Sequence, residues 1–111
     1  MIYLLTSKPT PEQVTEMLEE LTDYIKLAVD VEQSLIAGGG ELHADCEALL
    51  LAGGSKQVNI WGADWIPATR EVRYQSFINI RPSQNNPSME LLDPTLREQV
   101  NAIVWKIFEN L

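Results

Sequence analysis

The sequence predicts a single α+β domain over residues 1–111, with strands and helices in the order βαββαββα. Apolar and polar residues alternate in several short stretches, as in strands, and apolar residues recur every three or four positions in others, as in helices. Clusters of glycine, proline and asparagine separate these stretches. Strands joined by tight turns, with few helices between them, favour an antiparallel or mixed sheet with its helices mainly on one face.

A strand and a helix are predicted at the start of the chain. Residues 2–6 form a short apolar run that is typical of a strand. Thr10 can cap a helix, Pro11 suits the first helical position, and Gln13 completes a capping box with Thr10. Apolar residues follow at helical spacing as far as Leu21, which predicts one apolar stripe.

A hairpin and a second helix are predicted next. Residues 24–31 alternate as in a half-buried strand, and residues 32–34 form a turn into a second apolar run at residues 35–37. A helix is then expected over residues 41–52, because Gly53-Gly54 is typical of a helix C-terminus. Its apolar stripe is predicted to comprise Leu42, Cys46, Leu49 and Leu50.

The second half of the chain predicts two more strands and a last helix. The strands span residues 58–65 and 71–81, and a polar loop at residues 82–87 follows them. Asp93 before Pro94 is typical of a helix start. The apolar face of that helix is predicted to comprise Leu96, Val100, Ile103, Val104, Ile107 and Leu111.

The composition excludes several classes of function. With 16 acidic and 8 basic residues the net charge is −8, and no run of lysines and arginines offers a surface that attracts nucleic-acid phosphates. No apolar stretch approaches the ~20 residues that span a bilayer, and the N-terminus lacks the pattern of a signal peptide. The lone cysteine, Cys46, excludes cysteine-rich zinc sites and lies on a predicted buried stripe, where thiols are inert. We therefore expect a cytoplasmic protein that binds neither nucleic acid nor membrane.

The densest polar feature is the segment 38–45, Gly-Gly-Gly-Glu-Leu-His-Ala-Asp, at the expected start of the second helix. Glycine amides before a helix can hold an anion, or the glycines can allow positive φ and close packing of strand and helix. Glu41 and Asp45 would repel a phosphate, and no Gly-Lys-Ser/Thr follows the glycines. The structural role is therefore favoured.

No metal site is favoured in this segment. Side chains two apart on a helix point about 200° apart, so His43 and Asp45 cannot chelate one ion. His43 and Glu47 are four apart and share a face, but they need further ligands, such as Asp30 or Asp64. Because short motifs match by chance, a lone histidine that is hydrogen-bonded to a neighbour is the favoured alternative. We expect no cofactor.

Two tryptophans are candidate interface residues. Trp61 and Trp65 share one face of the predicted strand 58–65. Two tryptophans on one sheet face are typical of a core or of a protein interface. Because the chain is short, we expect a second subunit to cover this face and the protein to be a homodimer.

Hydrogen-bonding residues gather in the segment 79–88. Asn79 and Arg81 are expected to project from the same face at the end of the last strand. The guanidinium could clamp the carboxylate of a small ligand in a bidentate pair. An internal acid is the favoured alternative partner, either in the segment 38–45 or at Asp64. Such a pair would join the two polar segments into one network.

Several stretches together carry a resemblance to a known family. They are residues 25–31, 37–47, 54–57, 61–62 and 78–82. The combination resembles a family of short uncharacterised bacterial and archaeal proteins, with cyanobacterial members, that is catalogued as a domain of unknown function. The resemblance covers about residues 24 to 93 of the chain. It implies that the Gly-Glu-x-His-x-Asp and Asn-x-Arg-Pro segments mark the family, and it implies no catalytic residue.

Three functions stay open from the sequence. The favoured one is a small non-enzymatic binding or regulatory module that forms a homodimer. The second is a small enzyme or a protein that binds a small ligand or metal, and convergence of the His43 and Arg81 side chains in one pocket would favour it. The third is an antitoxin-like partner of a basic protein, which the chain's size and acidic charge alone support. The candidate polar site comprises Glu41, His43, Asp45, Glu47, Asn79 and Arg81.

Overall fold

A five-stranded antiparallel sheet forms the centre of the fold in the computed structural model, which describes residues 1–109. The strands are β1 (Tyr3–Leu5), β2 (Ile25–Asp30), β3 (Leu35–Gly38), β4 (Ile60–Ile66) and β5 (Glu71–Arg73), in the spatial order β1-β3-β2-β4-β5. The helices are α1 (Pro11–Met17), α2 (His43–Ala52) and α3 (Pro94–Phe108). The predicted α+β class and the element order βαββαββα are confirmed.

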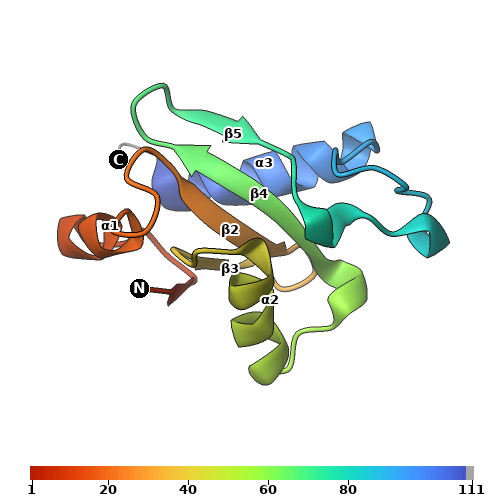
Figure 1. Ribbon diagram of the computed structural model, residues 1–111, viewed down its shortest axis with the longest axis horizontal. Coiled ribbons are helices and arrows are strands. Elements are labelled where there is room, and N and C mark those ends of the chain that lie inside the picture. Colours follow the sequence, from red (N-terminus) through yellow and green to blue (C-terminus); the bar gives the residue numbers. More distant parts are fainter. Residues whose placement is uncertain (110–111) are drawn as a thin grey trace.

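Helices lie on both faces of the sheet (Figure 1). α1 and α3 pack on the face that carries Leu27, Val29 and Trp65, which is the larger core. α2 covers the opposite face, where Ala28 and Ile60 are buried. Central strands covered on both faces lose their exposed side. β2 is therefore buried along most of both faces, and its expected half-buried character is wrong.

Local sequence sets the starts of two helices as predicted. The hydroxyl of Thr10 accepts a hydrogen bond from the Gln13 amide at 3.1 Å, and the Gln13 side chain accepts one from the Thr10 amide at 2.9 Å. Asp93 accepts a hydrogen bond from Thr95 at the start of α3. The end of α1 differs from the prediction, because the helix stops at Met17 and the residues after it form turns.

The buried face of α2 differs from the predicted stripe. Cys46 and Leu50 are buried, whereas Leu42 and Leu49 are 55% and 37% exposed. Leu42 is the residue that caps the helix, and His43 is the first residue that faces the sheet. Since apolar residues occur on more than one side of this helix, only its contacts with the sheet decide which of them are buried.

The segment after β5 is the largest departure from the predicted elements. The strand expected over residues 71–81 ends at Arg73. The chain then forms two single-turn 3-10 helices, η2 (Phe77–Asn79) and η3 (Pro82–Gln84), and a third, η1 (Gln57–Asn59), precedes β4. Of the face predicted for the last helix, Val100, Val104 and Ile107 are buried. Leu111 lies outside the described residues.

The glycines before α2 have a structural role. Gly39 has a φ of +105°, and a Cβ atom there would lie 2.2 Å from the carbonyl oxygen of Met1 and 2.8 Å from Cγ of Met17. A Cβ on Gly38 would lie 2.7 Å from Cδ2 of Leu27. The atom nearest Gly39 belongs to the backbone, whereas the tip of the Leu27 side chain near Gly38 can shift. Close packing of the N-terminus and α1 therefore requires glycine at position 39.

Gly39→Ala is expected to lower the free energy of unfolding by about 2–4 kcal/mol, from the positive φ and the steric overlap together. Gly54→Ala is the matched control, because Gly54 has a φ of +101° but a Cβ there would meet no atom within 4 Å. Its loss should be about 1 kcal/mol, from backbone strain alone. Urea denaturation measures both values, and equal losses would contradict the steric argument.

Candidate functional site

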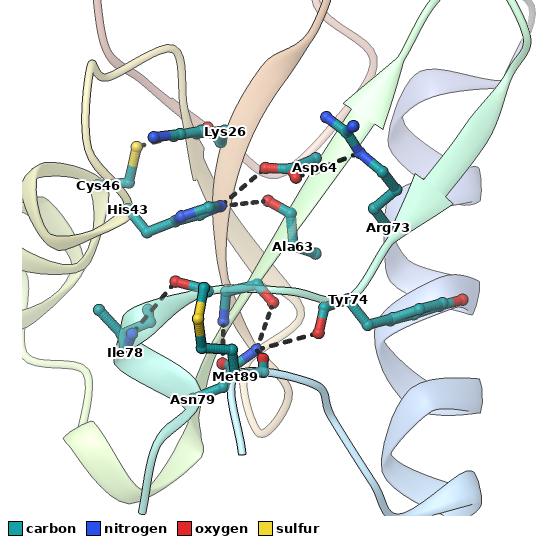
Figure 2. Close-up of polar contacts among 12 residues, drawn as sticks. Lys26, His43, Cys46, Ala63, Asp64, Arg73, Tyr74, Ile78, Asn79 and Met89 are labelled. Atoms are coloured by element: carbon teal, nitrogen blue, oxygen red, sulfur yellow. Dashed lines mark hydrogen bonds and ion pairs between the residues drawn. The ribbon is translucent and has the colours of Figure 1, made fainter.

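His43 is the polar residue that links α2 to the sheet. Its Nε2 atom lies 2.8 Å from Oδ1 of Asp64 and 3.0 Å from the carbonyl oxygen of Ala63, both on β4. Figure 2 shows the ring pointing from α2 toward these two acceptors. Because both neighbours of Nε2 are acceptors, this nitrogen carries a proton and donates to them.

Asp64 is the centre of a row of charged side chains that crosses the sheet. Lys26 on β2 and Arg73 on β5 are its direct cross-strand neighbours. Nε of Arg73 lies 3.5 Å from Oδ2 of Asp64, so both carboxylate oxygens have a partner. The row places two cations and one carboxylate beside His43, as Figure 2 shows.

This row borders a surface hollow of about 240 Å³. The polar part of its lining comprises Lys26, His43, Asp64, Arg73, Gln75 and Ser76, and the remaining residues are Tyr24, Phe77 and Met89. With His43 neutral, the charged side chains of the lining sum to +1, within a chain of net charge −8. Local charge of the opposite sign to the whole protein indicates an anion as the complementary ligand.

The two cations of the hollow keep free hydrogen-bond donors. The ammonium of Lys26 donates to the carbonyl oxygen of Glu41 at 3.1 Å, which uses one of its three N–H groups. The side chain of Arg73 is 47% exposed, and within residues 1–109 its terminal nitrogens meet no carboxylate. The guanidinium fork is therefore open to a bidentate anion.

Arg81 lies outside this hollow and is fixed by the backbone. Its guanidinium donates to the carbonyl oxygens of Ile78 at 2.9 Å and Gln57 at 2.6 Å, and to that of Ile60. It also lies 4.1 Å from the ring centroid of Trp61. Burial lowers the pKa of Arg81. The internal acid that we expected as its partner is replaced by backbone carbonyl groups of η1, η2 and the start of β4.

Asn79 is also a structural residue. Its side-chain oxygen accepts a hydrogen bond from the amide of Gly62 at 2.8 Å, and its Nδ2 donates to the Gly62 carbonyl at 3.0 Å. These are the two bonds that a neighbouring strand would make with β4. Asn86 continues the network, because its Nδ2 donates to the carbonyl oxygen of Asn79 at 2.8 Å. In place of the predicted strand, the Asn79 side chain therefore makes the hydrogen bonds to the β4 backbone that a neighbouring strand would make.

The six residues of the candidate polar site do not form one site. His43 borders the hollow, but Asn79 and Arg81 do not, and each of the three has internal partners. Glu41 and Asp45 are exposed, and Glu47 is half-buried. This arrangement counts against an enzyme that uses both segments.

The described part of the chain holds no metal cluster. Within residues 1–109, no three His, Cys, Asp or Glu side chains are grouped so that they could bind an ion. The carboxylate of Asp30, a possible ligand from the sequence, instead accepts hydrogen bonds from the amides of Glu32 and Gln33 and from the hydroxyl of Ser55 at 2.6 Å. It fixes the β2–β3 turn.

The two candidate interface tryptophans lie in the core of their own chain. Trp65 is fully buried and Trp61 is 3% exposed. The Trp65 ring stacks on Phe108, with centroids 5.6 Å apart, and meets the edge of Trp105 at 5.2 Å. The element that covers this face is α3, so the expected role of Trp61 and Trp65 as interface anchors is corrected.

None of the helices within residues 1–109 has the length and hydropathy to cross a bilayer.

Cys46 is expected to be unreactive in the folded protein. It is fully buried, its thiol donates to the carbonyl oxygen of Lys26, and burial raises its pKa to about 11. Ellman's reagent at pH 8 should therefore label Cys46 only after unfolding, since the thiolate is the nucleophile. Equal labelling rates in buffer and in urea would contradict this.

The same pKa shift predicts how stability depends on pH. The unfolded thiol has a pKa near 9.0, below the folded value of about 11. The protonated Cys46 thiol makes its full contribution to the free energy of unfolding below pH 9. This contribution is lost as pH rises from 9 to about 11, because only the thiol of the unfolded state ionises in that range. Cys46→Ala should remove this part of the pH dependence in urea denaturation.

Comparison with known proteins identifies the family. The model of the family described as "Protein of unknown function (DUF5674)" matches residues 3–107, so the chain belongs to this family. The resemblance drawn from the motifs of the middle segments is confirmed at the level of the family. No curated protein and no solved structure matches the chain.

Proposed function

We propose that this protein is a small binding module that holds a small anion in the hollow beside His43. The observation that carries the proposal is the row Lys26, Asp64 and Arg73, which gives the hollow one more cation than carboxylates. Because Asp64 is already paired through both oxygens, it does not compete for every donor of the two cations. An anion would complete the remaining hydrogen bonds of Arg73 and Lys26.

The His43–Asp64 pair supports the proposal by fixing the floor of the hollow. The pair is buried and joins α2 to β4, so the Asp64 carboxylate is held in a fixed position between His43 and Arg73. A site whose charged groups are held in place binds with a smaller loss of side-chain entropy. The hollow therefore provides a preformed setting for the ligand.

Titration with sodium acetate tests this proposal, followed by amide chemical shifts in ¹⁵N-labelled protein at fixed ionic strength. We expect saturable shifts around the hollow, with a dissociation constant of about 1–10 mM for so small a ligand. Arg73→Gln and Lys26→Gln should each weaken binding about tenfold, the value of one charge-assisted hydrogen bond.

Arg70→Gln is the matched control, since it removes the same charge from a residue that lies over the Trp105 ring. Arg70→Gln should leave the affinity within a factor of about two, because Arg70 is exposed and does not border the hollow, so it makes no direct contact with the anion. Absence of saturable shifts in the wild type, or equal weakening by all three substitutions, would overturn the proposal.

The expected homodimer stays a separate proposal. With Trp61 and Trp65 buried under α3, no residue singled out by the sequence supports it. Light scattering measures it directly, and the proposed anion site is built from a single chain and does not depend on the result.

A further inference from the structure

We propose that the ligand of this hollow is a monocarboxylate that carries one small apolar group, such as a single ring. This inference rests on the proposed anion site and specifies its ligand class. Three features of the hollow lead to it: its net charge, its apolar wall and its size.

The charge of the lining matches a monoanion. Lys26 and Arg73 contribute two positive charges and Asp64 one negative charge, with His43 neutral. A carboxylate would bring the summed charge of the site to zero. A doubly charged phosphate would make the sum −1 and would place the extra negative charge beside Asp64. Unbalanced charge in a partly desolvated site is costly, so the carboxylate is favoured.

Part of the lining of the hollow is apolar. Phe77 and Met89 border the hollow and are 77% and 37% exposed. In Figure 2, Met89 lies below His43, whereas Lys26 lies above it and Arg73 lies to the right beside Asp64. Large apolar side chains exposed together beside polar groups are typical of a ligand site.

The exposed position of Phe77 is imposed by the structure around it. Phe77 is the first residue of η2, whose start is capped by the buried Ser76 through a hydrogen bond from the Ile78 amide at 3.2 Å. Asn79 at the other end of η2 is fixed to Gly62 of β4. The backbone that carries Phe77 is thus held at both ends, so the ring cannot retreat into the core without breaking this network.

The size of the hollow limits the apolar group. Its volume of about 240 Å³ lies below the 300–1,000 Å³ of sites for drug-sized ligands. The hollow therefore suits a carboxylate with a single ring rather than a nucleotide or an extended peptide. In the proposed complex, the carboxylate of the ligand contacts Arg73 and Lys26, and its ring lies against Phe77 and Met89.

Calorimetric and chemical-shift titrations with sodium benzoate, sodium acetate and sodium phosphate test the inference. Benzoate should bind at least about tenfold more tightly than acetate, as burial of a ring predicts. Phe77→Ala should remove most of that advantage and leave acetate affinity unchanged. Val58→Ala is the control, because Val58 is 57% exposed and does not border the hollow.

The outcomes separate this inference from the proposed function. Equal affinities for benzoate and acetate, both weakened by Arg73→Gln, would overturn the ligand class and leave the anion site standing. Tighter binding of phosphate than of benzoate would overturn the ligand class as well. Failure of all three anions to bind would overturn both proposals. Because Phe77 is exposed, its substitution leaves the fold intact.

Discussion

Asn79→Asp is expected to lower the free energy of unfolding by about 3–5 kcal/mol, because it breaks a buried hydrogen-bond network. Asn79 is fully buried, and its Nδ2 donates to carbonyl oxygens of Gly62, Tyr74 and Met89. The substitution places a carboxylate oxygen against these three acceptors. The amide of Gly62 keeps its acceptor, so the loss comes from the missing donor and from burial of the carboxylate.

Urea denaturation, followed by tryptophan fluorescence, measures this loss. Asn101→Asp is the matched control, because Asn101 lies on α3 and makes no side-chain hydrogen bond within residues 1–109. Its effect should stay within about 0.5 kcal/mol, as is usual for substitutions without buried partners. Similar losses in the two variants would show that the Asn79 network contributes little to stability.

Arg81→Met is the second large expected effect, with a loss of about 3 kcal/mol. Methionine retains much of the apolar length of the side chain but leaves the carbonyl oxygens of Ile60 and Ile78 without the guanidinium donor. The carbonyl oxygen of Gln57 loses one of its two donors and keeps the amide of Ile60. The substitution also removes the cation from the face of the Trp61 ring. The free energy of unfolding is again measured in urea.

Arg81→Lys separates the effect of charge from that of geometry. A lysine keeps the positive charge, but its single nitrogen cannot reach three carbonyl groups that a planar fork contacts together. We expect a loss nearly as large as for methionine. A lysine variant as stable as the wild type would show that charge alone, rather than the guanidinium geometry, stabilises this segment.

Much of the fold follows from local sequence. Alternation and helical spacing predict the element order, and Thr10, Gln13 and Asp93 predict two helix starts, because caps depend on a few adjacent residues. The length of the last strand could not be predicted in this way. Alternation continues beyond Arg73, but the side chain of Asn79 takes the place of a strand neighbour for β4, which is a contact between residues distant in sequence.

The site was predictable only in part. As the lone histidine, with acidic residues around it, His43 is a candidate site residue from the sequence alone. Asp64 is among the carboxylates that the sequence analysis names as possible partners of His43. Lys26 and Arg73 were missed, because single charges on strands are typical of a solvent-facing side. The register that places Lys26, Asp64 and Arg73 side by side depends on strand order, which the sequence does not specify.

A crystal structure of the protein with 4-bromobenzoate, in which the anomalous scattering of bromine locates the ring, tests the anion site most directly. A second hollow provides an internal comparison: Arg73 borders it too, but Lys26 does not, and its Arg97 and Glu90 form an ion pair at 2.5 Å. We predict that the carboxylate contacts both the Arg73 guanidinium and the Lys26 ammonium, and that the bromine lies on the side of Phe77 and Met89. A ligand ordered only beside Arg97, or bound elsewhere on the surface, would contradict the proposed site.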